Sequence, residues 1–146
     1  MATKKIELTS DQYLLLIKMV YLGYWMASAH KDDVDPLVDD IEQHIYSFAS
    51  VFGLNNLVEF DKSLNKFLPS AEFEEEMETP VQEYDDYIFW EELSWRLAER
   101  DFTRKFDQAQ ILCMTVDEIL REKNTIADRY FEEFGINGVE NLNFSK

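Results

Sequence analysis

Hydrophobic residues recur along most of the chain at intervals of three and four positions, the spacing typical of α-helices. In residues 10–30 they cover every side of a helix, which predicts a buried N-terminal helix at the centre of the fold. Thr9 and Gln12 stand at the positions of a capping box and mark its start. The hydrophobic pattern therefore predicts a helical core built around this segment.

The next part of the chain shows two shorter helical stripes. Asp35-Pro36 provides an N-cap acceptor followed by proline at the first helical position, so a second helix starts here and should end at Gly53. Apolar residues at helical spacing over 57–67 predict a third helix, which Pro69 should stop. The glutamate-rich stretch 70–79 is expected to be a loop.

Capping signals also organise the C-terminal half. The sequence over residues 79–82 reads as a capping box with proline, which predicts a fourth helix running to about residue 105. A short helix is expected over 107–113. Thr115 and Glu118 form a further capping box that opens the last helix, which Gly135 should end.

These elements predict an all-α fold, a single-domain helical bundle of about five to six helices spanning residues 1–146, with 136–146 as a C-terminal tail. The chain has only 4 Gly and 3 Pro, far fewer turn residues than an all-β domain requires. We find no internal repeat and no linker long enough to divide the chain.

Negative charge is concentrated in the middle of the sequence. The net charge is −16, and residues 32–92 hold eighteen acidic residues against Lys62 and Lys66. Phosphates and anionic membrane surfaces repel such a segment. We therefore expect no direct nucleic-acid binding and no membrane partner.

A strongly acidic helical surface favours a non-enzymatic protein-interaction module whose partner is a protein, with a basic protein as one candidate. Aromatic side chains beside the acidic residues are typical anchors of such interfaces. Acidic inhibitors, DNA mimics and immunity-type proteins share this general composition and stay open as an alternative. The candidate interaction surface consists of Tyr87, Trp90, Glu91, Trp95, Glu72, Glu74, Glu75 and Glu76.

Catalytic signatures are missing from the sequence: there is no glycine-rich phosphate loop, no zinc-protease motif and no paired cysteines. This favours a protein that is not an enzyme and has no cofactor. A metal-dependent hydrolase with a carboxylate cage is the alternative, since Asp39-x-x-Glu42 has the spacing of helical metal sites, although the pair should face partly outward. The candidate metal ligands are His30, His44, Asp39 and Asp40.

Residues 84–101 form the densest part of the predicted fourth helix. Glu92 and Arg96 should form an ion pair one turn apart. Trp90 and Trp95 cannot share a helix face, so one should pack inward and the other be partly exposed. Cys113 lies in an apolar run and is expected in the core.

The compartment is predicted from two features. A single cysteine suits a reducing cytoplasm. The apolar run 14–26 resembles the core of a signal peptide, but Lys18 interrupts it, and Glu7 and Asp11 lie in the region that should be basic. The sequence therefore predicts a cytoplasmic protein, with a homo-oligomer as an open possibility.

Overall fold

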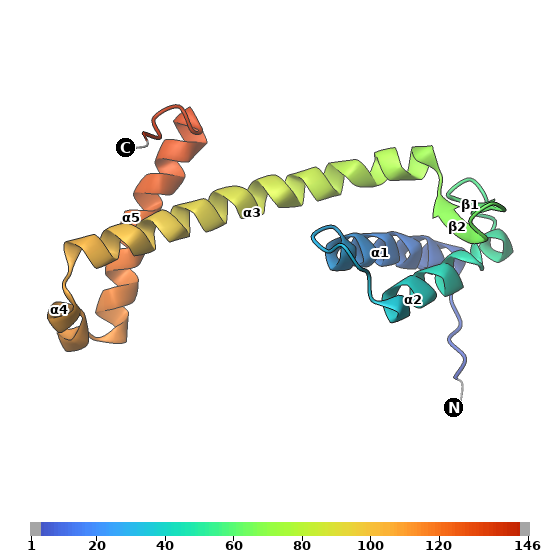
Figure 1. The fold of residues 1–146 in the computed structure, drawn as a ribbon, viewed down its shortest axis with the longest axis horizontal. Helices are drawn as coiled ribbons and strands as arrows, with labels where there is room; N and C mark the ends of the chain where they lie inside the picture. The colour runs from blue at the N-terminus through green and yellow to red at the C-terminus, as the bar shows by residue number, and fades with distance from the viewer. Residues whose placement is uncertain (1–3, 144–146) are drawn as a thin grey trace. The chain divides into compact units, whose positions relative to one another are not determined.

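The computed structural model describes residues 4–143. Within them the fold is predominantly helical, as predicted: five α-helices, one 3-10 helix and one two-stranded hairpin. The chain packs as two compact units, one extending to Val81 and the other starting at Gln82. The helix α3 (Ala71–Lys105) begins in the first unit and ends in the second (Figure 1).

The first unit is built on α1 (Ser10–Ser28) and α2 (Pro36–Tyr46), which lie side by side (Figure 1). The predicted capping box is present, since Thr9 accepts from the Gln12 backbone and Gln12 accepts from the Thr9 backbone. Burial of α1 is one-sided: Tyr13 and Ile17 enter the core, whereas Leu15 and Met19 are exposed. The unit is too small to surround an apolar helix completely.

The second predicted helix is shorter than expected. It starts at Asp35 and Pro36 as predicted but ends at Tyr46, and a 3-10 helix η1 (Ala49–Phe52) follows before Gly53 turns the chain at φ 75°. The Tyr13 ring stacks on Phe52 with 4.1 Å between ring centroids, which ties this turn to α1.

The predicted third helix is wrong, because residues 58–69 form an antiparallel hairpin of β1 (Val58–Asp61) and β2 (Lys66–Pro69). Phe60 and Phe67 face each other across the strands with ring centroids 4.9 Å apart. The Asp61 carboxylate accepts hydrogen bonds from the backbone of Ser63 and Leu64 and so closes the turn. The helical spacing of Phe60 and Phe67 was incidental, because the two side chains contact each other across the strands of the hairpin.

The expected loop over 70–79 is also wrong, and so is a helix start at Thr79. Helix α3 already begins at Ala71, where the Ser70 hydroxyl accepts from the Phe73 backbone. Phe73 and Met77, one turn apart, are buried in the core of the first unit. Their burial stabilises the helix enough for Pro80 to lie inside it despite the lost backbone hydrogen bond.

The second unit consists of the remainder of α3, α4 (Gln108–Cys113) and α5 (Val116–Asn137), with α5 lying against α3 (Figure 1). The predicted short helix and the Thr115–Glu118 capping box are both present. Helix α5 passes Gly135, the predicted end, and stops before Gly138, so the predicted tail is shorter by two residues. The part of that tail beyond residue 143 lies outside the described residues.

The core of the second unit is small and contains no cysteine. Its buried residues are Ala98, Phe102, Ile126 and Ala127. The expectation that Cys113 is buried is wrong: it is exposed, as is Leu112 before it, because α4 packs only its opposite side against the unit.

Candidate functional site

An open pocket of about 310 Å³ in the first unit combines carboxylates with aromatic rings. Helix α1 supplies three aromatic residues at its C-terminal end, α2 supplies acidic and amide groups, β2 closes one side, and the first turn of α3 adds a carboxylate. The lining residues are Tyr21, Tyr24, Trp25, Ser28, Asp39, Glu42, Gln43, Lys66, Phe67, Leu68, Pro69 and Glu74.

Glu42 is the most deeply buried charged group of the pocket, with 8% of its surface exposed. It lies one helical turn before the buried Tyr46, so both project from the same face of α2. No described residue forms an ion pair with it. Burial raises the pKa of Glu42 to about 6; Asp39 adds to the rise, and Tyr46, Gln43 and Lys66 offset part of it. The carboxylate therefore loses most of its proton near neutral pH while keeping little hydration.

The neighbouring Asp39 is neutralised within the unit. Lys66 Nζ contacts its two carboxylate oxygens at 2.7 and 2.8 Å. The same contact raises the pKa of the Lys66 amine. Because the lysine is already paired with Asp39, Glu42 is left as the buried acid of the pocket without a counter-ion of its own.

Gln43 fixes the wall of the pocket formed by β2. Its side-chain nitrogen donates to the Phe67 carbonyl at 2.9 Å, and its side-chain oxygen accepts from the Phe67 backbone at 2.7 Å. This pair of hydrogen bonds attaches α2 to β2 and holds Lys66 beside Asp39. The pocket is thus held by packing and backbone contacts that need no ligand.

Two tyrosines place hydroxyl groups in the field of these acids. Burial, together with Glu74, Glu42 and Glu78, raises the pKa of Tyr21. Burial, together with Glu42 and Asp39, raises the pKa of Tyr24. Both phenols are therefore neutral at physiological pH, and each can donate or accept a hydrogen bond.

Tyr46, four residues after Glu42 on α2, is fully buried and does not line the pocket. Burial raises its pKa, and the nearby Glu42 adds to the rise. Its hydroxyl lies close enough to Glu42 for each group to influence the pKa of the other, yet it makes no hydrogen bond of normal geometry with the described residues. The Tyr46 hydroxyl therefore keeps hydrogen-bonding capacity that no described residue uses.

A second hollow of about 340 Å³ continues from the pocket along α1 and α3 of the same unit. It shares Tyr21, Trp25 and Glu74 with the first and adds Glu75 and other residues of α3. We call the two hollows together the acidic aromatic groove. Its lining residues beyond the pocket are Glu75, Met77, Glu78 and Val81.

The acidic half of the predicted interaction surface lies next to this groove. Glu72, Glu74 and Glu75 are exposed on the first turns of α3 and make no ion pair with any described residue. Glu76 is exposed and bound by Lys18 of α1. Among the predicted surface residues of the first unit, Glu74 and Glu75 line the groove.

The aromatic half of that predicted surface belongs to the second unit. Tyr87 is 63% exposed, and its contact with Glu91 raises the pKa of the phenol. Trp90 is half-buried against Phe134, with 5.4 Å between ring centroids, whereas Trp95 is 38% exposed, as the spacing predicted. That these aromatics anchor a partner protein stays a prediction.

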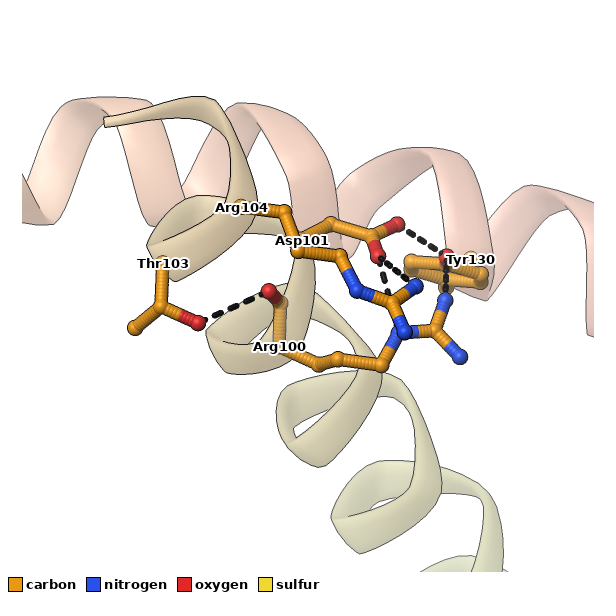
Figure 2. A network of polar contacts seen from close by, with 5 residues as sticks. All are labelled: Arg100, Asp101, Thr103, Arg104 and Tyr130. Atoms are coloured by element: carbon orange, nitrogen blue, oxygen red, sulfur yellow. Dashed lines mark hydrogen bonds and ion pairs between the residues drawn. The ribbon is translucent and has the colours of Figure 1, made fainter. Parts of the chain in front are cut away.

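The expected ion pair of the second unit is present, with 3.1 Å between Arg96 Nε and Glu92 Oε2. A second polar network joins α3 to α5 (Figure 2). Tyr130 donates to Asp101, and Arg100 donates to Asp101 at 2.8 Å and to the Tyr130 hydroxyl at 3.0 Å. Since these polar groups bind one another, the network joins helices and offers no vacant site.

The candidate metal ligands are not gathered. His30, His44 and Asp40 are exposed, and Asp39 is paired with Lys66. Over residues 4–143 there is no group of three or more His, Cys, Asp or Glu side chains placed to hold a metal ion. The expectation that Asp39 and Glu42 both face partly outward is wrong for Glu42, because α1 covers that side of α2.

Comparisons with known proteins add no assignment: no protein family, no curated protein and no solved structure matches the chain. None of the described helices is both long enough and apolar enough to cross a membrane. Arguments about function therefore depend on the residues of the two units themselves.

Sequence reasoning considered Glu42 only as half of an acidic pair and missed the pocket. The sequence offers little signal for this, because the apolar residues Leu37 and Ile41 of the same helix are exposed, whereas Glu42 and Tyr46 are buried. Only the packing of α1 and the hairpin against α2 shows that Glu42 is buried and lines a pocket.

Proposed function

We propose that the chain is a non-enzymatic binding protein that recognises a basic segment of a partner protein through the acidic aromatic groove and the adjoining first turns of α3. The supporting observation is the charge of the first unit, which contains six lysines against fifteen acidic residues, a net charge of −9. Two of its lysines, Lys18 and Lys66, are already held by Glu76 and Asp39.

The position of the exposed acids beside the groove supports a role in attracting a basic partner, in addition to keeping the chain in solution. Glu72, Glu74 and Glu75 are exposed on the first turns of α3, and Glu74 and Glu75 line the groove together with Tyr21 and Trp25. Long-range attraction speeds the encounter with a basic partner, and aromatic rings in a groove supply the apolar contact area that retains it. Acidic inhibitors and DNA-mimicking proteins are special cases of this role.

Binding of defined peptides tests the proposal. A panel of peptides carrying four lysines or arginines, with sequence-matched glutamine and glutamate versions, is titrated against the chain at 50 and 300 mM salt. We expect the basic peptides alone to bind and their affinity to fall steeply with salt.

The variant Glu72→Gln/Glu74→Gln/Glu75→Gln should slow association about tenfold at low salt, because it removes attracting charges from the groove and from the adjoining first turn of α3. Its matched control removes three exposed acids from the second unit, Asp128→Asn/Glu132→Gln/Glu140→Gln, and has the same net charge. Equal loss in both triple variants would mean that only overall charge matters and would contradict a binding surface on the first unit.

A further inference from the structure

We propose that the pocket formed by α1, α2, β2 and the start of α3 in the first unit takes a guanidinium group, the side chain of an arginine presented by the basic partner. This inference rests on the proposed function and assigns the chemical group that the groove recognises. It follows from the uncompensated charge of the pocket, from its aromatic walls and from its size.

The uncompensated negative charge of the pocket favours binding of a cation. Glu42 is more than nine-tenths buried and has no ion-pair partner among the described residues, while Lys66 is occupied by Asp39 at 2.7 Å. A buried carboxylate without a counter-ion is costly, and a cation placed beside it recovers that cost. Glu74, from the first turn of α3, adds a further carboxylate to the same lining.

The walls of the pocket suit a planar cation in particular. Tyr21, Tyr24 and Trp25 present aromatic rings on which a guanidinium can stack. Its five N–H donors match the available acceptors, which are the carboxylates of Glu42 and Glu74 and the hydroxyls of the two tyrosines. An ammonium group has three donors and no flat face, so it uses this lining less completely.

The size of the pocket limits the ligand to a small group. Its volume of about 310 Å³ is at the lower end of the range for small-molecule sites. A single side chain fits this space, whereas a nucleotide would bring its phosphates toward the three carboxylates of the lining, Asp39, Glu42 and Glu74. The second hollow along Glu74 and Glu75 continues the path for residues flanking the arginine.

Binding is coupled to the proton on Glu42. The charged and titratable groups that surround it are Tyr21 and Tyr24 from α1, Asp39 and Tyr46 from α2, Lys66 from β2 and Glu74 from α3. The pKa values of the three tyrosines and of Lys66 are raised from already high values. These groups therefore keep their protons between pH 5 and 7.5. Glu42 becomes protonated across this interval, and guanidinium binding should weaken about tenfold from pH 7.5 to pH 5.

The test is an NMR titration of the ¹⁵N-labelled full chain with N-acetyl-arginine amide, followed at the indole N–H signals. The chain has three tryptophans, and Trp25 alone among them lines the pocket, so its signal should shift and saturate with a Kd on the order of 1 mM. The signals of Trp90 and Trp95, in the second unit, serve as controls within the same spectrum. N-acetyl-citrulline amide, which is neutral and of the same shape, should leave Trp25 unmoved.

Two variants separate the pocket from general acidity. Glu42→Gln keeps the shape of the side chain and should abolish saturable binding of the arginine amide together with its pH dependence. Asp40→Asn removes the same charge from the exposed side of α2 and should bind like the original chain. Circular dichroism of both variants verifies folding, and the Trp25 shift in the unaltered chain tests the pocket even if a variant unfolds.

The outcomes distinguish this inference from the proposed function. Equal shifts with arginine and citrulline amides, or no saturable Trp25 shift, would overturn the guanidinium pocket even if basic peptides still bind. Tighter binding of N-acetyl-lysine amide than of arginine amide would overturn it as well. A saturable arginine shift with no gain in affinity from an arginine-containing basic peptide would support the pocket and contradict the protein partner.

Discussion

Glu42 leads to a stability prediction that runs against the usual effect of changing a buried residue. Replacing it with glutamine should stabilise the folded chain at neutral and alkaline pH. Burial raises the pKa of Glu42 from 4.5 to about 6, so the folded state holds the charged form less favourably than the unfolded chain does. Glutamine has the same shape and never becomes charged.

The magnitude follows from the size of the pKa change. One pKa unit corresponds to 1.36 kcal/mol, so the ionised carboxylate costs the folded state about 2 kcal/mol at pH 8, where it is charged in both states. Below the unfolded pKa of 4.5, Glu42 is protonated in both states and the folded chain keeps its full stability. This stability falls as the pH rises through the folded pKa of about 6, where the buried carboxyl loses its proton. At pH 5 the difference between Glu42→Gln and the original chain should fall to about 0.8 kcal/mol.

Urea unfolding at pH 8 and pH 5 measures this difference, with amide signals of Tyr13 and Ile17 reporting on the core of the first unit. Asp40→Asn is the control, because Asp40 is exposed on the same helix and its loss should not produce a gain that grows with pH. A Glu42→Gln chain that is less stable at pH 8, or an advantage that increases toward pH 5, would refute the reasoning. If the prediction holds, the same substitution increases stability and abolishes guanidinium binding, the trade-off expected of a binding residue.

The second unit supplies two further predictions. Tyr130→Phe removes the hydroxyl that donates to Asp101 and accepts from Arg100. The second unit should therefore lose about 1 kcal/mol of unfolding free energy, measured by urea titration at pH 7. Unchanged stability would show that water replaces these hydrogen bonds at no cost. Cys113 is exposed on α4, so one equivalent of a thiol reagent such as dithiobisnitrobenzoate should react with the native chain without denaturant, and protection of the thiol until unfolding would contradict the structure.

Local signals in the sequence predicted several helix starts well. Thr9 with Gln12 and Thr115 with Glu118 supply side-chain acceptors to free backbone N–H groups, and Asp35 does so before Pro36. This chemistry depends on neighbours only two or three residues away. The helical fold class follows from the same local information together with the apolar period.

The errors occur where distant contacts decide the structure. Phe60 and Phe67 have helical spacing, yet they meet across two strands because the hairpin packs on the core of the first unit. Pro80 is a strong local start signal, but burial of Phe73 and Met77 starts α3 nine residues earlier. Side-chain burial outweighs the cost of one missing backbone hydrogen bond.

The pocket shows the same limit for function. The sequence places Asp39 and Glu42 on one helix and the three aromatics on another. Asp39 is paired because the hairpin brings Lys66 beside it, and Glu42 is buried because α1 packs on that side of α2. A chain with 30 acidic residues offers many similar pairs, so spacing alone could not single out Glu42.

The two hydrogen bonds between Gln43 and the Phe67 backbone have a consequence for aggregation. A strand at the border of a sheet normally exposes unpaired N–H and C=O groups that can recruit a strand from another molecule. On β2 the amide of Gln43 occupies both backbone groups of Phe67 in the way that a neighbouring strand would. One glutamine side chain therefore covers this edge of the hairpin and protects the chain from growth by strand addition there.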